Sequence, residues 1–193
     1  MKNLKAFVAV VFILMLMTGC SQAFDADTNT VYVKKDGTVM QAIIEEFSES
    51  NYDQNELEEL IKQDVSSYNN GTESIKVEKY KVKDNTAKLI TSYKKASDYA
   101  MFNDVEFFAG TISEAKTEGY EFDDMFTSID ENNTIGSETI KSLSQYKVVI
   151  FEENVRIMTD GKILYMSSNT KLIDAKTAAL NEDAEGLGYI IYE

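Results

Sequence analysis

The sequence contains no histidine, no tryptophan and no proline, and its 193 residues include a single cysteine, Cys20. Histidine is the commonest general base and transition-metal ligand, so its absence excludes the usual serine triad and most transition-metal sites. One cysteine can form neither an intramolecular disulfide nor a cysteine-rich zinc site. No serine stands in a Gly-x-Ser-x-Gly motif, and glycine-rich phosphate loops are absent. We therefore lean towards a protein that is not an enzyme and expect no cofactor.

Basic residues are scarce relative to acidic ones. The chain has 19 Lys and Arg against 33 Asp and Glu, a net charge of -14. Such a chain repels phosphate backbones, and we expect no nucleic-acid partner. The same acidity gives no electrostatic help at an anionic membrane, so any membrane attachment requires another device. The hydrophobic content of 44% is sufficient for a packed core.

The first residues have the pattern of an export signal. Lys2 and Lys5 precede an unbroken apolar run over residues 6–17. As a helix this run would span roughly 18 Å, short of the roughly 30 Å of a bilayer core. A signal-peptide core fits this length better than a transmembrane helix.

The sequence Met17-Thr18-Gly19-Cys20 resembles the lipobox of bacterial lipoproteins, although Met17 stands where leucine is commoner. The resemblance implies that residues 1–19 are a signal peptide cut before Cys20. It also implies that the Cys20 thiol carries a diacylglycerol and a palmitate-type lipid anchor at the extracytoplasmic face of the cell membrane. Two acyl chains give stable anchoring. The alternative is that Cys20 is a core cysteine at the end of a transmembrane helix, but Ser21 and the polar residues after it do not continue an apolar segment.

The remaining chain divides into a short segment and one domain. Residues 20–30 are mostly small, polar and acidic, and we expect a lipidated tether there. Residues 31–193 predict a single α+β domain, with a mainly antiparallel sheet of hairpins and a few short to medium helices packed on it. Asp36-Gly37 and Asp160-Gly161 each separate two strand-like segments, and each predicts a hairpin. A third hairpin is expected between residues 75–83 and 87–93, with a bulge near Glu78.

Helical spacing of apolar residues predicts the clearest helix after Asp53, which can cap it, and Asn69-Asn70-Gly71 is a plausible stop. Shorter helices are expected at residues 97–103, from Ser113 to Gly119, and at 137–143. Further strands are expected at residues 105–112, 147–151, 155–158, 162–166 and 188–192. Residues 121–145 otherwise suggest loops.

Three segments resemble lipoproteins of anaerobic gut-type Firmicutes. They are Asp98-Tyr99-Ala100-Met101-Phe102-Asn103, Phe108-Ala109-Gly110-Thr111 and Gly161-Lys162-Ile163-Leu164-Tyr165-Met166-Ser167. Those proteins are largely uncharacterised, so the resemblance implies a Gram-positive-like envelope and supplies no activity.

Acidic residues suggest two kinds of chemistry, glycoside hydrolysis and calcium binding, and each has a simpler alternative interpretation. A glycosidase needs two carboxylates about 5–10 Å apart across a cleft. The adjacent acids Glu45-Glu46, Asp123-Asp124 and Glu152-Glu153 are better explained as solvated surface, because neighbours on a strand point to opposite faces. Two stretches resemble the start of a calcium loop, and both lack glycine at the turn position: Asp25, Asp27 and Asn29; and Asp130, Asn132 and Thr134.

The 11 tyrosines, all beyond residue 19, can close a core that lacks tryptophan or line a binding surface. We expect Tyr80, Tyr93, Tyr146 and Tyr165 to belong to the core. The function that these patterns favour is a non-catalytic binding or scaffolding module of the cell envelope, with an envelope protein or an extracellular ligand as partner. The alternatives are a carboxylate-dependent hydrolase acting on wall or host glycans and a calcium-stabilised adhesion module.

Overall fold

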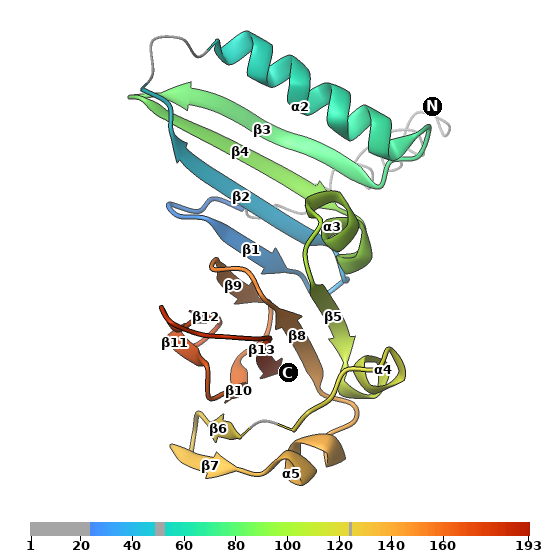
Figure 1. The fold of residues 1–193 in the computed structure, drawn as a ribbon, viewed down its shortest axis with the longest axis vertical. Helices are drawn as coiled ribbons and strands as arrows, with labels where there is room; N and C mark the ends of the chain where they lie inside the picture. The colour runs from blue at the N-terminus through green and yellow to red at the C-terminus, as the bar shows by residue number, and fades with distance from the viewer. Residues whose placement is uncertain (1–23, 49–52, 124) are drawn as a thin grey trace, which may run out of the picture.

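The computed structural model describes residues 24–48, 53–123 and 125–193. The predicted signal peptide, the lipobox and Cys20 lie outside the described residues. Two sheets form the body of the molecule, with helices at its periphery (Figure 1). All strand neighbours but one are antiparallel, which confirms the predicted α+β class with a mainly antiparallel sheet.

The larger sheet has seven strands. Their order is β11 (Thr170–Asp174), β12 (Thr177–Leu180), β9 (Arg156–Thr159), β1 (Thr30–Val33), β2 (Val39–Glu46), β4 (Thr86–Tyr93) and β3 (Ile75–Lys83). Helix α2 (Gln54–Asn69) lies along β3 (Figure 1). Strands β1 and β9 are the parallel pair.

The smaller sheet has six strands. Their order is β5 (Phe107–Thr111), β8 (Lys147–Phe151), β13 (Gly188–Tyr192), β10 (Ile163–Ser167), β6 (Phe126–Ser128) and β7 (Asn133–Ile135). Three short helices accompany it: α3 (Ala96–Asn103), α4 (Ile112–Thr117) and α5 (Ser137–Ser142).

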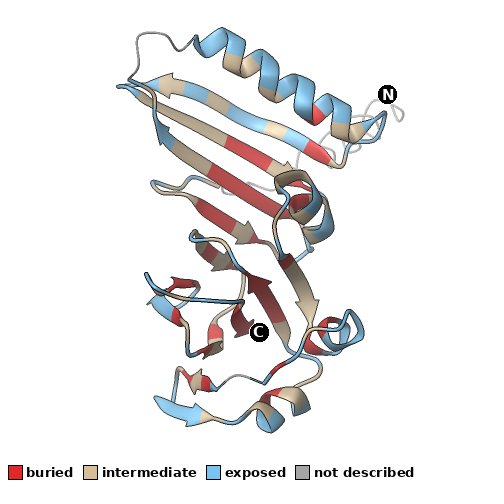
Figure 2. Cartoon of the chain, viewed as in Figure 1, coloured by how far each residue is buried: buried red, intermediate tan, exposed pale blue. Residues whose placement is uncertain are grey.

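The central strands of the smaller sheet are buried on both faces (Figure 2). Val149 and Phe151 of β8 enter the largest core cluster, which draws residues from both sheets and from α3. Val148 and Ile150 enter a second cluster on the opposite face, where α4 and α5 contribute Ile112, Ala115 and Ile140. Burial on both sides explains why β8 and β13 are continuous apolar runs without alternation.

The segment before β1 packs on the outer face of the larger sheet. Phe24 and Ala26 cover a third cluster formed by Met40, Ala42 and Ile90. Two residues of the predicted tether, Phe24 and Ala26, therefore pack on this sheet. The composition of this mostly polar segment does not predict that its apolar side chains pack on a sheet face.

The local turn chemistry of the first and third predicted hairpins is confirmed. β1 and β2 pair across Asp36-Gly37, where Gly37 has φ +85°. β3 and β4 pair across Asp84 and Asn85, both in the left-handed region that a two-residue hairpin turn requires. The register of this pair shifts between Val77 and Lys79, at the predicted bulge.

The hairpin predicted at Asp160-Gly161 was wrong. β9 and β10 flank Asp160-Gly161 but belong to different sheets: β9 pairs with β1 and β12, and β10 with β13 and β6. The Asp160 carboxylate accepts a hydrogen bond from the Tyr32 hydroxyl at 2.9 Å, and the Asp160 amide donates to the carbonyl of Val33. The turn residues thus bond to β1, and the chain crosses from one sheet to the other.

Helix ends followed their capping chemistry. Asp53 caps α2, and Asn70 ends it with φ +42°. The predicted start of α4 at Ser113 was wrong, because Thr111 is the N-cap: it forms a reciprocal capping box with Glu114, and the helix begins at Ile112. The short strands β6, β7, β11 and β12 were not predicted. β6 and β12 pair with the distant strands β10 and β9, and β7 and β11 are added at the sheet edges by pairing with β6 and β12.

Candidate functional site

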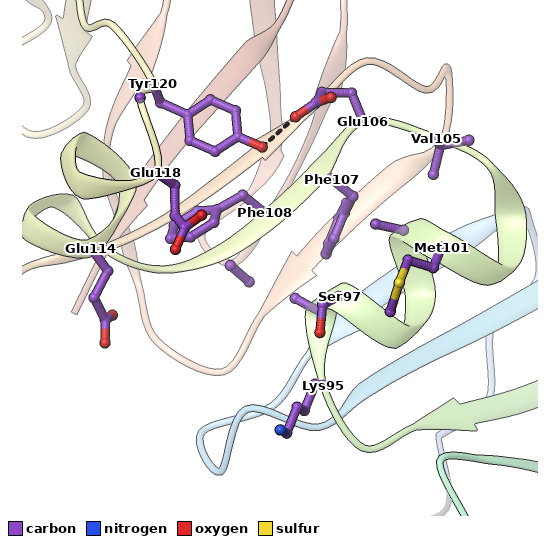
Figure 3. A pocket seen from close by; sticks show the side chains of 14 residues that line it. Lys95, Ser97, Met101, Val105, Glu106, Phe107, Phe108, Glu114, Glu118 and Tyr120 are labelled. Atoms are coloured by element: carbon purple, nitrogen blue, oxygen red, sulfur yellow. Dashed lines mark hydrogen bonds between the residues drawn. The ribbon is translucent and has the colours of Figure 1, made fainter. Parts of the chain in front are cut away.

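A groove of about 890 Å³ follows β5, an edge strand of the smaller sheet (Figure 3). We call it the β5 groove. The residues that line it include Lys95, Ser97, Ala100 and Met101 from the α3 side, Glu106, Phe107, Phe108 and Ala109 on and before β5, and Glu114, Glu118 and Tyr120 from the α4 side. Three elements that are consecutive in the chain therefore form one concave surface.

The α3 wall is anchored by Tyr99, which is 0% exposed. Its ring lies edge-on to Phe107 at 4.7 Å and to Tyr93 at 5.2 Å between centroids. Its hydroxyl donates to the Glu153 carboxylate at 2.6 Å. With one side of α3 held in the core, Met101 is left 65% exposed at the groove.

The α4 wall depends on a contact between two tilted aromatic rings and on a tight helix end. Gly119 has φ +94°, a conformation that ends the helix and brings Tyr120 back over Phe108, with ring centroids 5.3 Å apart. The Tyr120 hydroxyl donates to the Glu106 carboxylate (Figure 3). A Cβ at Gly110 would lie 2.7 Å from the Phe108 ring, so glycine allows that ring to lie against the strand. Burial, and then the bond to Glu106, raises the pKa of Tyr120.

The main chain of β5 offers hydrogen-bonding groups to the groove. Among the described residues β5 pairs only with β8, so its other edge has no strand beside it. The Ile112 amide donates to the Tyr146 carbonyl. Because residues of an antiparallel strand bond alternately towards and away from the partner strand, this bond sets which residues of β5 bond to β8. Residues 108 and 110 consequently bond to β8, and the N–H and C=O groups of Phe107 and Ala109 point away from it. The Thr111 amide, of the same outward set, donates to Glu114 within the capping box.

The rim of the groove is predominantly acidic. Of the described residues that line it, Glu106, Glu114 and Glu118 are acidic and Lys95 is the one cation. Hydrogen bonds from the Thr111 main chain and side chain hold the pKa of Glu114 below its usual range, so this carboxyl is ionised at neutral pH. A neighbouring depression adds Asp104 and Glu152. The groove therefore combines an aromatic and aliphatic floor, outward-facing main-chain groups and negative charge.

The adjacent acids that the sequence interprets as solvated surface do not line this groove. Glu45 accepts a hydrogen bond from Asn29, and Asp123 forms an ion pair with Lys141 at 2.9 Å. Asp124 lies outside the described residues. Glu152 accepts from the Glu106 amide at 3.0 Å.

Glu153 is the one described carboxyl whose pKa is raised. Burial is the main cause and the neighbouring Glu152 adds to it, while the Tyr99 bond acts in the opposite direction. It is absent from the groove lining.

In the two stretches that resemble a calcium loop, the side chains that would bind calcium contact other residues. Asp25 pairs with Lys88, and Asp27 lies 3.7 Å from the Arg156 guanidinium. Asn29 accepts the Ile44 amide at 2.7 Å.

In the second stretch, Asp130 pairs with Lys162 at 2.6 Å. Within the part of the chain that the structure describes, no group of three or more acidic or cysteine side chains is arranged to hold a metal ion.

The tyrosine expectations had mixed outcomes. Tyr93 is 1% exposed, which confirms its place in the core, and Tyr165 packs partly buried on the second cluster. Tyr80 is half-buried beside α2, where its hydroxyl donates to the Gln54 carbonyl. Tyr146 is 38% exposed, so its assignment to the core was wrong. The sequence did not single out Tyr120, whose role depends on a ring contact across a helix end.

No known family model matches this chain, and comparison with curated proteins and with solved structures also yields no match. In the described part of the chain, no helix is both long and apolar enough to cross a bilayer.

Proposed function

We propose that this protein is a lipid-anchored, extracytoplasmic binding module of the cell envelope, and that the β5 groove is where it holds its partner. The lipobox-like sequence ending at Cys20 supports the anchor. The observation that carries the binding role is the groove itself, in which apolar side chains and outward main-chain groups share one surface. Ligand sites are concave and mostly apolar, with a few polar groups that fix orientation.

The anchor is tested by Cys20→Ala. We expect the variant to lose incorporation of a palmitate analogue and to retain its signal peptide, uncut before residue 20. Two acyl chains account for stable attachment, so removing the thiol removes both. Unchanged cleavage before residue 20 together with unchanged membrane association would overturn the anchor.

The binding role is tested by selecting displayed random peptides against the full-length protein in detergent micelles. Selected peptides are then measured against Met101→Glu, which puts a charge into the groove. Met125→Glu is the matched control, because Met125 is 54% exposed and does not line the groove. We expect binding to fall at least about tenfold in the first variant only, since a buried apolar contact becomes an unpaired charge. Equal binding to all three proteins would exclude the groove as the site.

A further inference from the structure

We infer that the partner is an extended, basic peptide segment that adds to β5 as a further antiparallel strand. This inference rests on the proposed function, because it names the occupant of the same groove. Added strands bind through main-chain hydrogen bonds and are selected through alternate side chains.

The edge of β5 differs from that of β3 at the far side of the other sheet. β3 carries Lys76, Lys79, Lys81 and Lys83, and edge lysines protect a strand from unwanted pairing. β5 has no charged residue within Phe107–Thr111. The outward N–H and C=O groups of Phe107 and Ala109 therefore remain available to an incoming strand.

The two walls suit different side chains. In an antiparallel addition, the residues that bond to Phe107 and Ala109 place their side chains on the same face as those two, towards α3. There Ala100 and Met101 provide a small, apolar surface. The alternate residues point towards α4, where the rings of Phe108 and Tyr120 and the side chain of Glu118 line the groove (Figure 3).

A lysine or arginine matches the α4 wall better than any other residue. Its aliphatic stem can cover the Phe108 and Tyr120 rings while its cation reaches the carboxylates of Glu106 and Glu118. The expected partner thus alternates basic and apolar residues. A second copy of this chain fits less well, because β5 against β5 would bring two acidic rims together.

The test uses a fluorescent peptide, acetyl-Lys-Val-Lys-Val-Lys-Val-Lys-amide, and the full-length protein in detergent micelles. We expect the fluorescence anisotropy to rise to saturation with protein concentration, and the affinity to fall as the salt concentration is raised. In NMR spectra we expect the amide resonances of Phe107 and Ala109 to shift when the peptide is added. The same peptide with glutamate in place of lysine should not bind. Glu118→Lys should weaken binding about threefold to tenfold. Glu121→Lys, an exposed change outside the groove, should not.

Backbone methylation distinguishes strand addition from simple charge attraction. Methylating the valine nitrogens removes the donors that face β5 and should abolish binding, whereas methylating the lysine nitrogens should not. Equal affinity of the two methylated peptides would overturn strand addition, as would dimerisation through β5 that excludes the peptide. If selected peptides of another composition bind at Met101 while the lysine–valine peptide does not, the partner chemistry is wrong and the proposed function stands. If Met101→Glu changes the binding of no peptide, both fail.

Discussion

Removing the Tyr99 hydroxyl tests how α3 is fastened beneath the groove. The Tyr99 ring is fully buried against Phe107, and its hydroxyl donates to the Glu153 carboxylate at 2.6 Å. Tyr99→Phe retains the ring and removes only this bond. The change therefore isolates one interaction between α3 and the residues that follow β8.

The magnitude follows from the charge of the acceptor. A hydrogen bond to a charged group contributes about 1.5–3 kcal/mol to the free energy of unfolding, against about 0.5–1.5 kcal/mol between neutral groups. Glu153 is only partly buried, so water replaces some of the lost bond, and we expect a loss of about 2 kcal/mol. For a chain of this size that lowers the melting temperature by about 4–8 °C. In a Glu153→Gln background the acceptor is neutral, and the same change should cost about 1 kcal/mol.

The assay is urea and thermal unfolding of the four proteins of this double-mutant cycle at pH 7, followed by circular dichroism. Tyr32→Phe is the control, since the Tyr32 hydroxyl also donates to a carboxylate, that of Asp160, from a more exposed position. The reasoning is refuted if Tyr99→Phe costs no more than the control. It is equally refuted if its cost is the same with Glu and with Gln at position 153.

Three further predictions concern stability. Burial raises the folded-state pKa of Glu153, so ionisation of this carboxyl lowers the stability of the folded protein. The free energy of unfolding of Glu153→Gln, relative to that of wild type, should therefore increase as pH rises from about 4 to 7 in unfolding titrations. A relative free energy that decreases over this range would contradict the prediction. Gly161→Ala should lower the free energy of unfolding by about 1–3 kcal/mol, because the new Cβ would collide with the Glu193 carbonyl. Gly136 has open space around it, so Gly136→Ala should be nearly neutral in the same denaturation assay. Asp53→Ala should cost about 1 kcal/mol by removing the side chain that accepts two amides at the start of α2, and an unchanged urea midpoint would refute the cap.

Local chemistry by itself determined much of this protein. The Asp36-Gly37 turn, the cap at Asp53 and the left-handed stop at Asn70 each depend on a few neighbouring residues, so a linear pattern suffices to predict them. The α+β class followed from the same short-range signals. The proposed lipid anchor at Cys20 is likewise a local motif.

Only the tertiary structure decided which strands meet and where a binding surface lies. Asp160-Gly161 has the local chemistry of a hairpin turn, yet the strands beside it pair with distant partners in two sheets. The β5 groove exists because Tyr99 fixes α3 through Phe107 and Glu153, while Tyr120 folds back over Phe108. Strand pairing and ring contacts between distant residues are set by total burial, and burial is a property of the assembled core rather than of any segment.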